Sequence, residues 1–214
     1  MDTPHERTVA PLLGEPLPVE LMNTIWADRA GVHDALTTTD EVLAWLRAVG
    51  ARLDEVAPGM TARVADEWPG QLGVTAHALG QLRDALRRLT AEQTDDPRGR
   101  AASAIADRTA ALEVVNAAVA ASPSWPALLW PVDHEAEAVW RFAEPAGLAC
   151  VSVLASQFVR LLSDDPGLEL RACLAPGCVL YFAKDRTRRE WCSTGCGNRA
   201  RAARHYEKKR SSKS

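Results

Sequence analysis

The chain has 214 residues, of which 47% are hydrophobic and 25% charged, and its formal net charge at pH 7 is -3. This composition is typical of a globular protein and excludes wholesale disorder. No stretch approaches the roughly 18 to 20 uncharged apolar residues of a membrane-spanning helix, and residues 1–7 lack the basic region and apolar run of a secretory signal. We therefore expect a soluble, cytoplasmic protein without a membrane partner.

Helical signals occupy most of the first half of the chain. Residues 1–16 hold three prolines and little apolar periodicity, so we expect a flexible leader there. A short helix is expected over 19–27. Thr38 and Glu41 have the spacing of a capping box, which opens a second helix that Gly50 is expected to stop.

Two longer helices are expected before residue 122. Over 74–90, four leucines fall within about 80° on a helical wheel, with the arginines of this segment outside the apolar stripe. The leucines are Leu79, Leu82, Leu86 and Leu89. A second helix is expected over 101–121, with its apolar side chains turned inward: Ile105, Leu112, Val115 and Val119.

Prolines interrupt the helical pattern between residues 122 and 142. Residues 128–130 and 138–140 have the character of two short strands around an acidic turn, which predicts a β-hairpin. Residues 145–163 are apolar nearly all round and predict a buried central helix. The run Asp164-Asp165-Pro166-Gly167 predicts a domain boundary, so the helical domain is expected over 17–165.

Charge is divided unequally along the chain. Residues 171–214 hold 12 Lys and Arg against 3 Asp and Glu, a net charge of +9, whereas residues 1–170 have a net charge of -12. Such asymmetry indicates a nucleic-acid contact in the basic part. The alternative from charge alone is a solubilising tail.

Four of the five cysteines lie close together in this basic part. They form two pairs, Cys173-x4-Cys178 and Cys192-x3-Cys196, separated by 13 residues. Two close pairs separated by a loop are the arrangement that lets a chain surround a tetrahedral metal ion. We expect one structural Zn²⁺, because four thiolates suit zinc; an iron–sulfur cluster and disulfides are the alternatives. With four protein ligands the site would be closed and would not catalyse.

The residues around these cysteines resemble a known family. The run Trp191-Cys192-Ser193-Thr194-Gly195-Cys196-Gly197-Asn198-Arg199 resembles the signature of CGNR zinc fingers. Many members place four residues between the last two cysteines and have another linker at 184–189, which indicates a subgroup. The resemblance implies a small DNA-binding zinc finger, expected over 166–210 with a tail at 211–214.

The helical part resembles the ABATE domain that usually accompanies this finger. The matching residues are Asn23, Thr24, Asp34, Leu36, Asp40, Leu43, Trp45, Leu46, Gly50, Leu79, Leu82, Arg83 and Asn116. This second resemblance implies a bacterial, stress-response transcription regulator. The expected fold is mainly α: a helical N-terminal domain with a short β-hairpin, followed by a small four-cysteine zinc finger that ends in a basic helix.

Residues 197–210 are expected to form that basic helix. Ala202, Ala203 and Tyr206 would face the two knuckles, which are the turns that carry the cysteine pairs. The opposite face and the preceding loop would contact nucleic acid. The candidate residues are Arg186, Arg188, Arg189, Arg199, Arg201, Arg204, His205 and Lys208. For Arg199 the alternative is a hydrogen bond to backbone carbonyls of the knuckles, and Trp191 and Tyr206 are expected in a small core.

The helical domain would serve as a sensor or a dimerisation unit. Asn23, Arg83 and Asn116 are polar among apolar neighbours, which makes them candidates for a small-effector pocket; the alternative is that they are buried polar groups with internal partners. No catalytic motif is complete, since Ala138 stands where His134-Glu135 would need a second histidine, and we expect no enzyme. An RNA-binding protein and a zinc-stapled protein-interaction module are the alternative functions.

Overall fold

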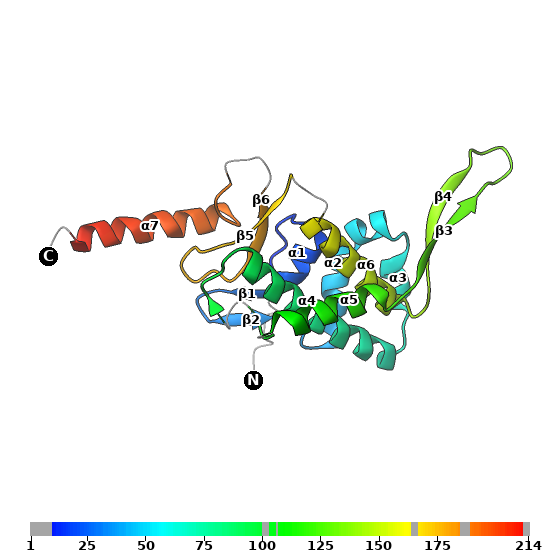
Figure 1. Cartoon of the computed structure of the whole chain (residues 1–214), viewed down its shortest axis with the longest axis horizontal. Helices are drawn as coiled ribbons and strands as arrows, with labels where there is room; N and C mark the ends of the chain where they lie inside the picture. The colour runs from blue at the N-terminus through cyan, green and yellow to red at the C-terminus, as the bar shows by residue number, and fades with distance from the viewer. Residues whose placement is uncertain (1–9, 100–102, 106, 164–166, 185–188, 212–214) are drawn as a thin grey trace, which may run out of the picture.

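The computed structural model describes residues 10–99, 103–105, 107–163, 167–184 and 189–211. Within these ranges the chain is mainly α, as expected (Figure 1). The helices are α1 (Leu17–Met22), α2 (Thr39–Val56), α3 (Met60–Ala65), α4 (Pro69–Gln93), α5 (Arg108–Ala120), α6 (Ala146–Ser163) and α7 (Thr194–Ser211). The strands form antiparallel hairpins: β1 (Ile25–Ala27) with β2 (Val32–Asp34), β3 (Ser124–Leu129) with β4 (Glu137–Phe142), and β5 (Glu169–Ala172) with β6 (Tyr181–Lys184).

The core is built around α4, which packs against α1, α2, α5 and α6. Its predicted leucine stripe is buried, but so are Arg83 and Arg87, which were expected outside the stripe. The helix is buried on more than one side because the β5–β6 hairpin also packs against it. Gly147 of α6 permits the close approach of α4: a Cβ atom there would lie 1.8 Å from Thr75 Oγ1.

Helix α2 begins as predicted and ends later than predicted. The Thr38 hydroxyl accepts from the backbone N–H of Glu41, whose carboxylate accepts from the N–H of Thr38, which is the capping box. Gly50 does not stop the helix, which continues to Val56 and buries Leu53. The glycine instead makes room for α3, because a Cβ atom would lie 3.0 Å from Thr61 Cγ2.

Two other helices are shorter than the sequence predicted. The helix expected over 19–27 ends at Met22, and the chain turns into β1 instead. The helix expected over 101–121 begins only at Arg108, where the Asp107 side chain accepts from the first backbone N–H groups. Val115 is buried as expected, whereas Leu112 is exposed. Residues 101, 102 and 106 of that prediction lie outside the described residues.

The predicted hairpin and buried helix between residues 122 and 163 are both present. Strands β3 and β4 pair from Ser124 with Phe142 to Leu129 with Glu137. Helix α6 packs against α3, α4 and α5. It is also the one described helix that is long and apolar enough to span a membrane, a test that core helices of globular proteins pass as well.

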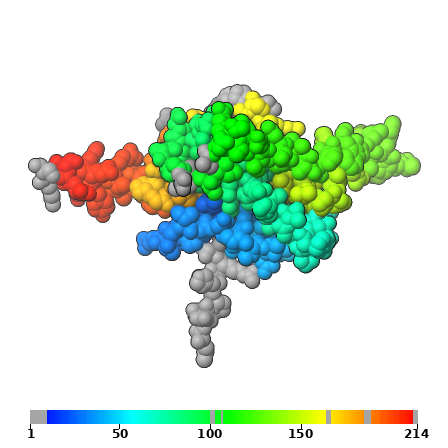
Figure 2. Space-filling model, turned by 60° about the horizontal axis from the view of Figure 1, so that its bottom comes forward, coloured from blue at the N-terminus to red at the C-terminus, as the bar shows by residue number. Residues whose placement is uncertain are grey.

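The C-terminal region is joined to the helical body through β5 and β6. Leu170, Tyr181 and Ala183 of this hairpin belong to the same apolar cluster as the helices of the body. Helix α7 then leaves the body at one end of the molecule, and the β3–β4 hairpin projects from the other (Figures 1 and 2). The predicted boundary at 164–167 lies largely outside the described residues.

The structure differs from the expected flexible leader from residue 10 onward. Ala10 and Glu15 are buried, and the Glu15 carboxylate accepts from the backbone N–H of Ala183 in β6 at 2.9 Å. The Glu20 carboxylate of α1 accepts from the N–H groups of Leu13 and Glu15. Carboxylate hydrogen bonds therefore hold 10–16 against the body, and residues 1–9 of the expected leader lie outside the described residues.

Candidate metal centre and nucleic-acid interface

The four clustered cysteines meet at one point of the structure. All four are buried, and their Sγ atoms lie within 4.8 Å of one another. Two of these separations are 3.8 Å, from Cys178 to Cys192, and 3.3 Å, from Cys192 to Cys196. A tetrahedron with Zn–S bonds of about 2.3 Å has sulfur atoms about 3.8 Å apart, so the arrangement fits one zinc ion.

Two different local structures bring the thiols together. Cys173 and Cys178 lie in the connection between β5 and β6, where Gly177 has a φ of +73° in the left-handed region that favours glycine. Cys192 precedes α7 and Cys196 lies in its first turn, where the Ser193 hydroxyl accepts from the Cys196 N–H. The positive end of the helix dipole therefore lies beside two of the sulfur atoms.

The thiols of Cys173, Cys178 and Cys192 influence one another's ionisation. The thiols of Cys178 and Cys192 donate to Cys173 and lower its pKa to about 2, whereas the same contacts raise the pKa of Cys178 to about 12 and raise that of Cys192. One thiolate thus opposes the ionisation of the next. A dication between them removes this opposition, and a closed set of four thiolates is the donor set of a structural zinc.

Arg199 lies in contact with this cluster. Its Nη2 donates to Cys196 Sγ at 2.9 Å, while the residue as a whole remains exposed. The expected alternative for Arg199 was a bond to knuckle carbonyls, and the structure shows a bond to a ligand sulfur instead. Four thiolates around Zn²⁺ carry a net charge of -2, which a guanidinium partly neutralises.

A small apolar cluster surrounds the thiols. The cysteines pack with Ala175, Leu180 and Phe182, and Trp191 covers them from outside, as expected. Leu13 and Trp26 of the N-terminal region pack against the same cluster. The metal centre is therefore enclosed by residues from both ends of the chain.

The binding of the finger to the body involves buried polar groups that the sequence analysis missed. The Arg87 guanidinium of α4 donates to the carbonyls of Met22 and Val179, at 2.9 and 3.1 Å, and lies over the Tyr181 ring. Burial lowers the pKa of Arg87 to about 10, so it remains charged at neutral pH. Arg87 thus joins α1, α4 and the finger.

Arg98 makes a second connection next to a metal ligand. It donates to the carbonyl of Cys178 at 3.1 Å and pairs with Asp96, which also accepts from the Tyr181 hydroxyl at 2.7 Å. Burial alone would raise the pKa of Asp96, but the hydrogen bonds from Arg98 and Tyr181 outweigh it and lower the pKa. The carboxylate and both of its donors are therefore fixed in place beside the metal centre.

Comparison with protein families agrees with this geometry. A family model described as "Putative stress-induced transcription regulator", ABATE, matches residues 15–165, which is more than half of the chain. The chain belongs to the ABATE family. The model of the CGNR zinc finger matches residues 169–209 and includes all four cysteines of the metal centre. No curated protein matches the chain significantly.

The CGNR finger ends in α7, and most of the predicted nucleic-acid residues lie on it. Arg199, Arg201, Arg204, His205 and Lys208 are all exposed. Arg201 donates to the Asn198 side chain and Arg204 to the Ala200 carbonyl, so both guanidinium groups are held along their own helix.

The prediction that one face of this helix packs on the turns that carry the cysteines is wrong beyond Ala200. Ala200 is buried, but Ala202 and Tyr206 are exposed, and Tyr206 retains 68% of its accessible surface. The reason is geometric. Each helical residue advances about 1.5 Å, so Tyr206 lies about 9 Å beyond Ala200 and past the metal cluster.

The nucleic-acid candidates in the loop before α7 differ in what the structure shows of them. Arg186 and Arg188 lie outside the described residues. Arg189 forms an ion pair with the buried Glu15, donates to the carbonyls of Trp191 and Cys192, and lies over the Phe182 ring. These contacts hold the finger to the N-terminal segment, so a role of Arg189 in nucleic-acid binding stays a prediction that its geometry does not favour.

The candidate effector residues do not form one pocket. The Asn23 amide bonds both the carbonyl and the N–H of Tyr181, each at 2.9 Å. Arg83 is buried in ion pairs with Asp34 and Asp84, and Asn116 is exposed on α5. Asn23 and Arg83 therefore match the alternative of internally bonded polar groups.

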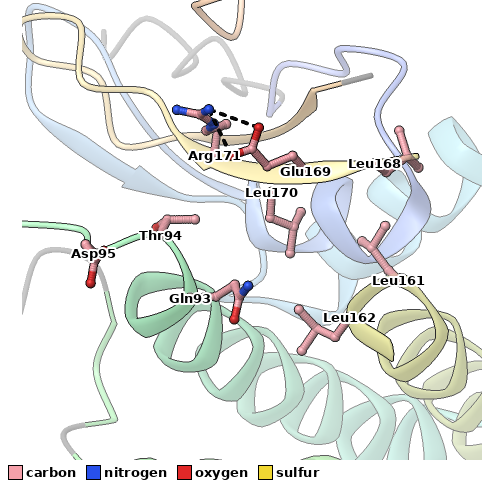
Figure 3. A pocket seen from close by; sticks show the side chains of 9 residues that line it. All are labelled: Gln93, Thr94, Asp95, Leu161, Leu162, Leu168, Glu169, Leu170 and Arg171. Atoms are coloured by element: carbon pink, nitrogen blue, oxygen red, sulfur yellow. Dashed lines mark hydrogen bonds and ion pairs between the residues drawn. The ribbon is translucent and has the colours of Figure 1, made fainter. Parts of the chain in front are cut away.

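A cavity of about 590 Å³ lies elsewhere, where the ends of α4 and α6 meet β5 (Figure 3). Leu161, Leu162 and Leu170 line it together with Gln93, and Arg171 pairs with Glu169 at its rim. The cavity touches both the ABATE body and the first strand of the finger.

Proposed function

We propose that this protein is a bacterial, cytoplasmic transcription regulator that binds duplex DNA through α7. The observation that carries the proposal is that no residue of this helix beyond Ala200 is buried, and all of them except the half-buried Ala203 are exposed. Its exposed basic residues are Arg199, Arg201, Arg204, Lys208, Lys209 and Arg210, against one acidic residue, Glu207. A polar helix that projects from a folded body and has a strongly positive charge is suited to a polyanion.

The dimensions of the free helix suit a DNA groove. Residues 201–211 extend about 16 Å, and a helix about 10 to 12 Å wide enters the major groove of B-form DNA. Arginine can grip phosphate or the edge of guanine with two hydrogen bonds. Lysines near the last turn also interact favourably with the negative end of the helix dipole and stabilise the helix.

The remaining parts of the molecule would hold and regulate this helix. A four-thiolate zinc has no open coordination position, so its role would be structural and we assign the protein no catalytic activity. The ABATE domain would act as the sensor or dimerisation unit of a stress-induced regulator. An effector in the cavity of Figure 3 would contact the body and β5 together, and could thereby alter the position of the finger.

The test compares nucleic-acid binding by the zinc-loaded protein and two double variants. Arg201→Ala with Arg204→Ala removes two charges from α7, and Arg29→Ala with Arg47→Ala removes two exposed charges from the body. Fluorescence anisotropy with duplex DNA should show weaker binding for the first variant only. The logarithm of the affinity should also fall by about 0.9 per log unit of salt for each phosphate contacted.

Two outcomes would replace the proposal with one of its alternatives. Tighter binding to single-stranded RNA than to duplex DNA of equal length would indicate an RNA-binding protein. Equal DNA binding by wild type and the α7 variant would favour a zinc-stapled module for protein interaction.

A further inference from the structure

The β3–β4 hairpin exposes several large apolar side chains to solvent. It extends from the body at the end opposite α7 (Figures 1 and 2). Five large apolar side chains on or next to it are exposed: Trp125, Leu128, Trp130, Val132 and Trp140. An isolated two-stranded hairpin has little stability in water, and exposed patches rich in tryptophan are typical of protein interfaces.

The two edges of this hairpin are not equivalent. Among the described residues each strand pairs with one other strand only, so its outer edge carries no neighbouring strand. On β3, Pro126 pairs with Trp140 and has no N–H, which weakens that outer edge as a template for another strand. Strand β4, Glu137–Phe142, contains no proline, so its outer edge can form backbone hydrogen bonds with another strand.

The hydrogen-bond alternation shows which groups lie at the outer edge of β4. Ala143 donates to the carbonyl of Pro123 at 3.0 Å, so its backbone faces β3. Because this direction alternates along an antiparallel strand, Val139 also faces β3, whereas Ala138 and Trp140 present their N–H and C=O groups outward. Arg63 donates to the Phe142 carbonyl at this edge, beside the body and away from the centre of the strand.

The sequence of β4 is complementary to itself in the antiparallel direction. Residues 137–141 read Glu-Ala-Val-Trp-Arg, so a twofold axis at Val139 places Glu137 opposite Arg141 of a second copy, twice. In the same register Ala138 lies opposite Trp140, a small residue beside a large one. Both residues have outward-directed backbone groups, so this register also forms the hydrogen-bonded pairs correctly.

We propose that β4 pairs with β4 of a second copy of this chain, forming a four-stranded antiparallel sheet of two hairpins around a twofold axis. The apolar side chains of Pro126, Leu128, Ala138 and Trp140 then become one continuous face with those of the second copy. The acidic tips at 133–135 point to opposite ends of the sheet and do not repel each other. The two α7 helices lie at the far ends of the dimer, where both remain free.

This interface is independent of the proposed DNA binding, and its test is the oligomeric state of the full, zinc-loaded chain. Analytical ultracentrifugation over a range of concentrations should show a dimer of the 23.2 kDa chain. Glu137→Arg alone and Arg141→Glu alone each place like charges opposite each other twice, and each should weaken the dimer about tenfold. The double variant with both changes restores opposite pairs and should recover the wild-type dissociation constant.

Chemical cross-linking tests the register separately from the energetics. Val139 lies at the twofold axis in a non-hydrogen-bonded pair, where Cα atoms are about 4.5 Å apart and a disulfide can form. Val139→Cys should therefore give a disulfide-linked dimer on mild oxidation. Val132→Cys at the exposed end of the hairpin, and wild type treated in the same way, should not.

The inference is overturned by a chain that is monomeric throughout, or by a dimer that is unaffected by both single variants. Weakening by the single variants without recovery in the double variant contradicts the register at Val139, as does equal cross-linking at positions 132 and 139. Circular dichroism of each variant separates loss of the interface from loss of the fold.

Discussion

The CGNR finger consists of two halves that differ in their relation to the body. The β5–β6 half is held by buried polar contacts from Asn23, Arg87 and Arg98, whereas α7 has no buried side chain after Ala200. The metal centre lies between the halves and takes two cysteines from each. The first half thus fixes the position of the finger, and the second leaves its charged surface to a partner.

The largest expected effect comes from breaking the centre that joins the halves. Cys196→Ser removes the ligand in the first turn of α7, so we expect zinc content to fall from one ion per chain to near zero. A closed structural site contributes about 10 to 16 kcal/mol of folding free energy in isolated zinc-finger peptides, so the finger should unfold without it. Elemental analysis and circular dichroism measure the two changes.

Cys150→Ala provides the matched control for this experiment. Cys150 is fully buried in α6, and burial raises the pKa of its thiol to about 12, so it stays uncharged. The variant should lose some core packing but keep its zinc. Retention of full zinc by Cys196→Ser would show that the four thiols do not form one site.

The second prediction tests the contacts that hold the β5–β6 half to the body. Asn23→Ala leaves the N–H and C=O of Tyr181 without their side-chain partner in a buried place, so the free energy of unfolding should fall by about 2 to 4 kcal/mol. Asn116→Ala is the same substitution at an exposed position of α5 and should change it by less than about 0.5 kcal/mol. Urea unfolding compares the two, and equal losses would refute the importance of this contact.

Local sequence signals predicted the parts of the fold that depend on near neighbours. The capping box at Thr38, the leucine stripe of α4, the β3–β4 hairpin and the four cysteine ligands each follow from spacing within a few turns of chain. The cysteine pairs indicated the metal centre because thiolates have few other roles in such a pattern.

Local sequence signals do not predict contacts between distant segments. Asn23 meets Tyr181 across 158 residues, and Arg87 meets Val179 across 92, so no local pattern marks either pair. The helical wheel of this segment places Arg87 outside the leucine stripe, whereas the structure buries it. The sequence predicts a helix stop at Gly50, whereas the glycine makes room for Thr61 of α3, a contact that local spacing does not reveal.

The smallest expected effect concerns α7, the half of the finger that projects from the body. Tyr206 is 68% exposed and about 9 Å beyond the last buried residue of α7, so Tyr206→Ala should change the free energy of unfolding by less than about 0.5 kcal/mol. Thermal unfolding of the zinc-loaded protein measures this. A loss above about 1 kcal/mol would show that Tyr206 packs within the fold and would remove the contrast between the two halves. A small loss of stability combined with weaker DNA binding would place the tyrosine at the surface where the proposed partner binds.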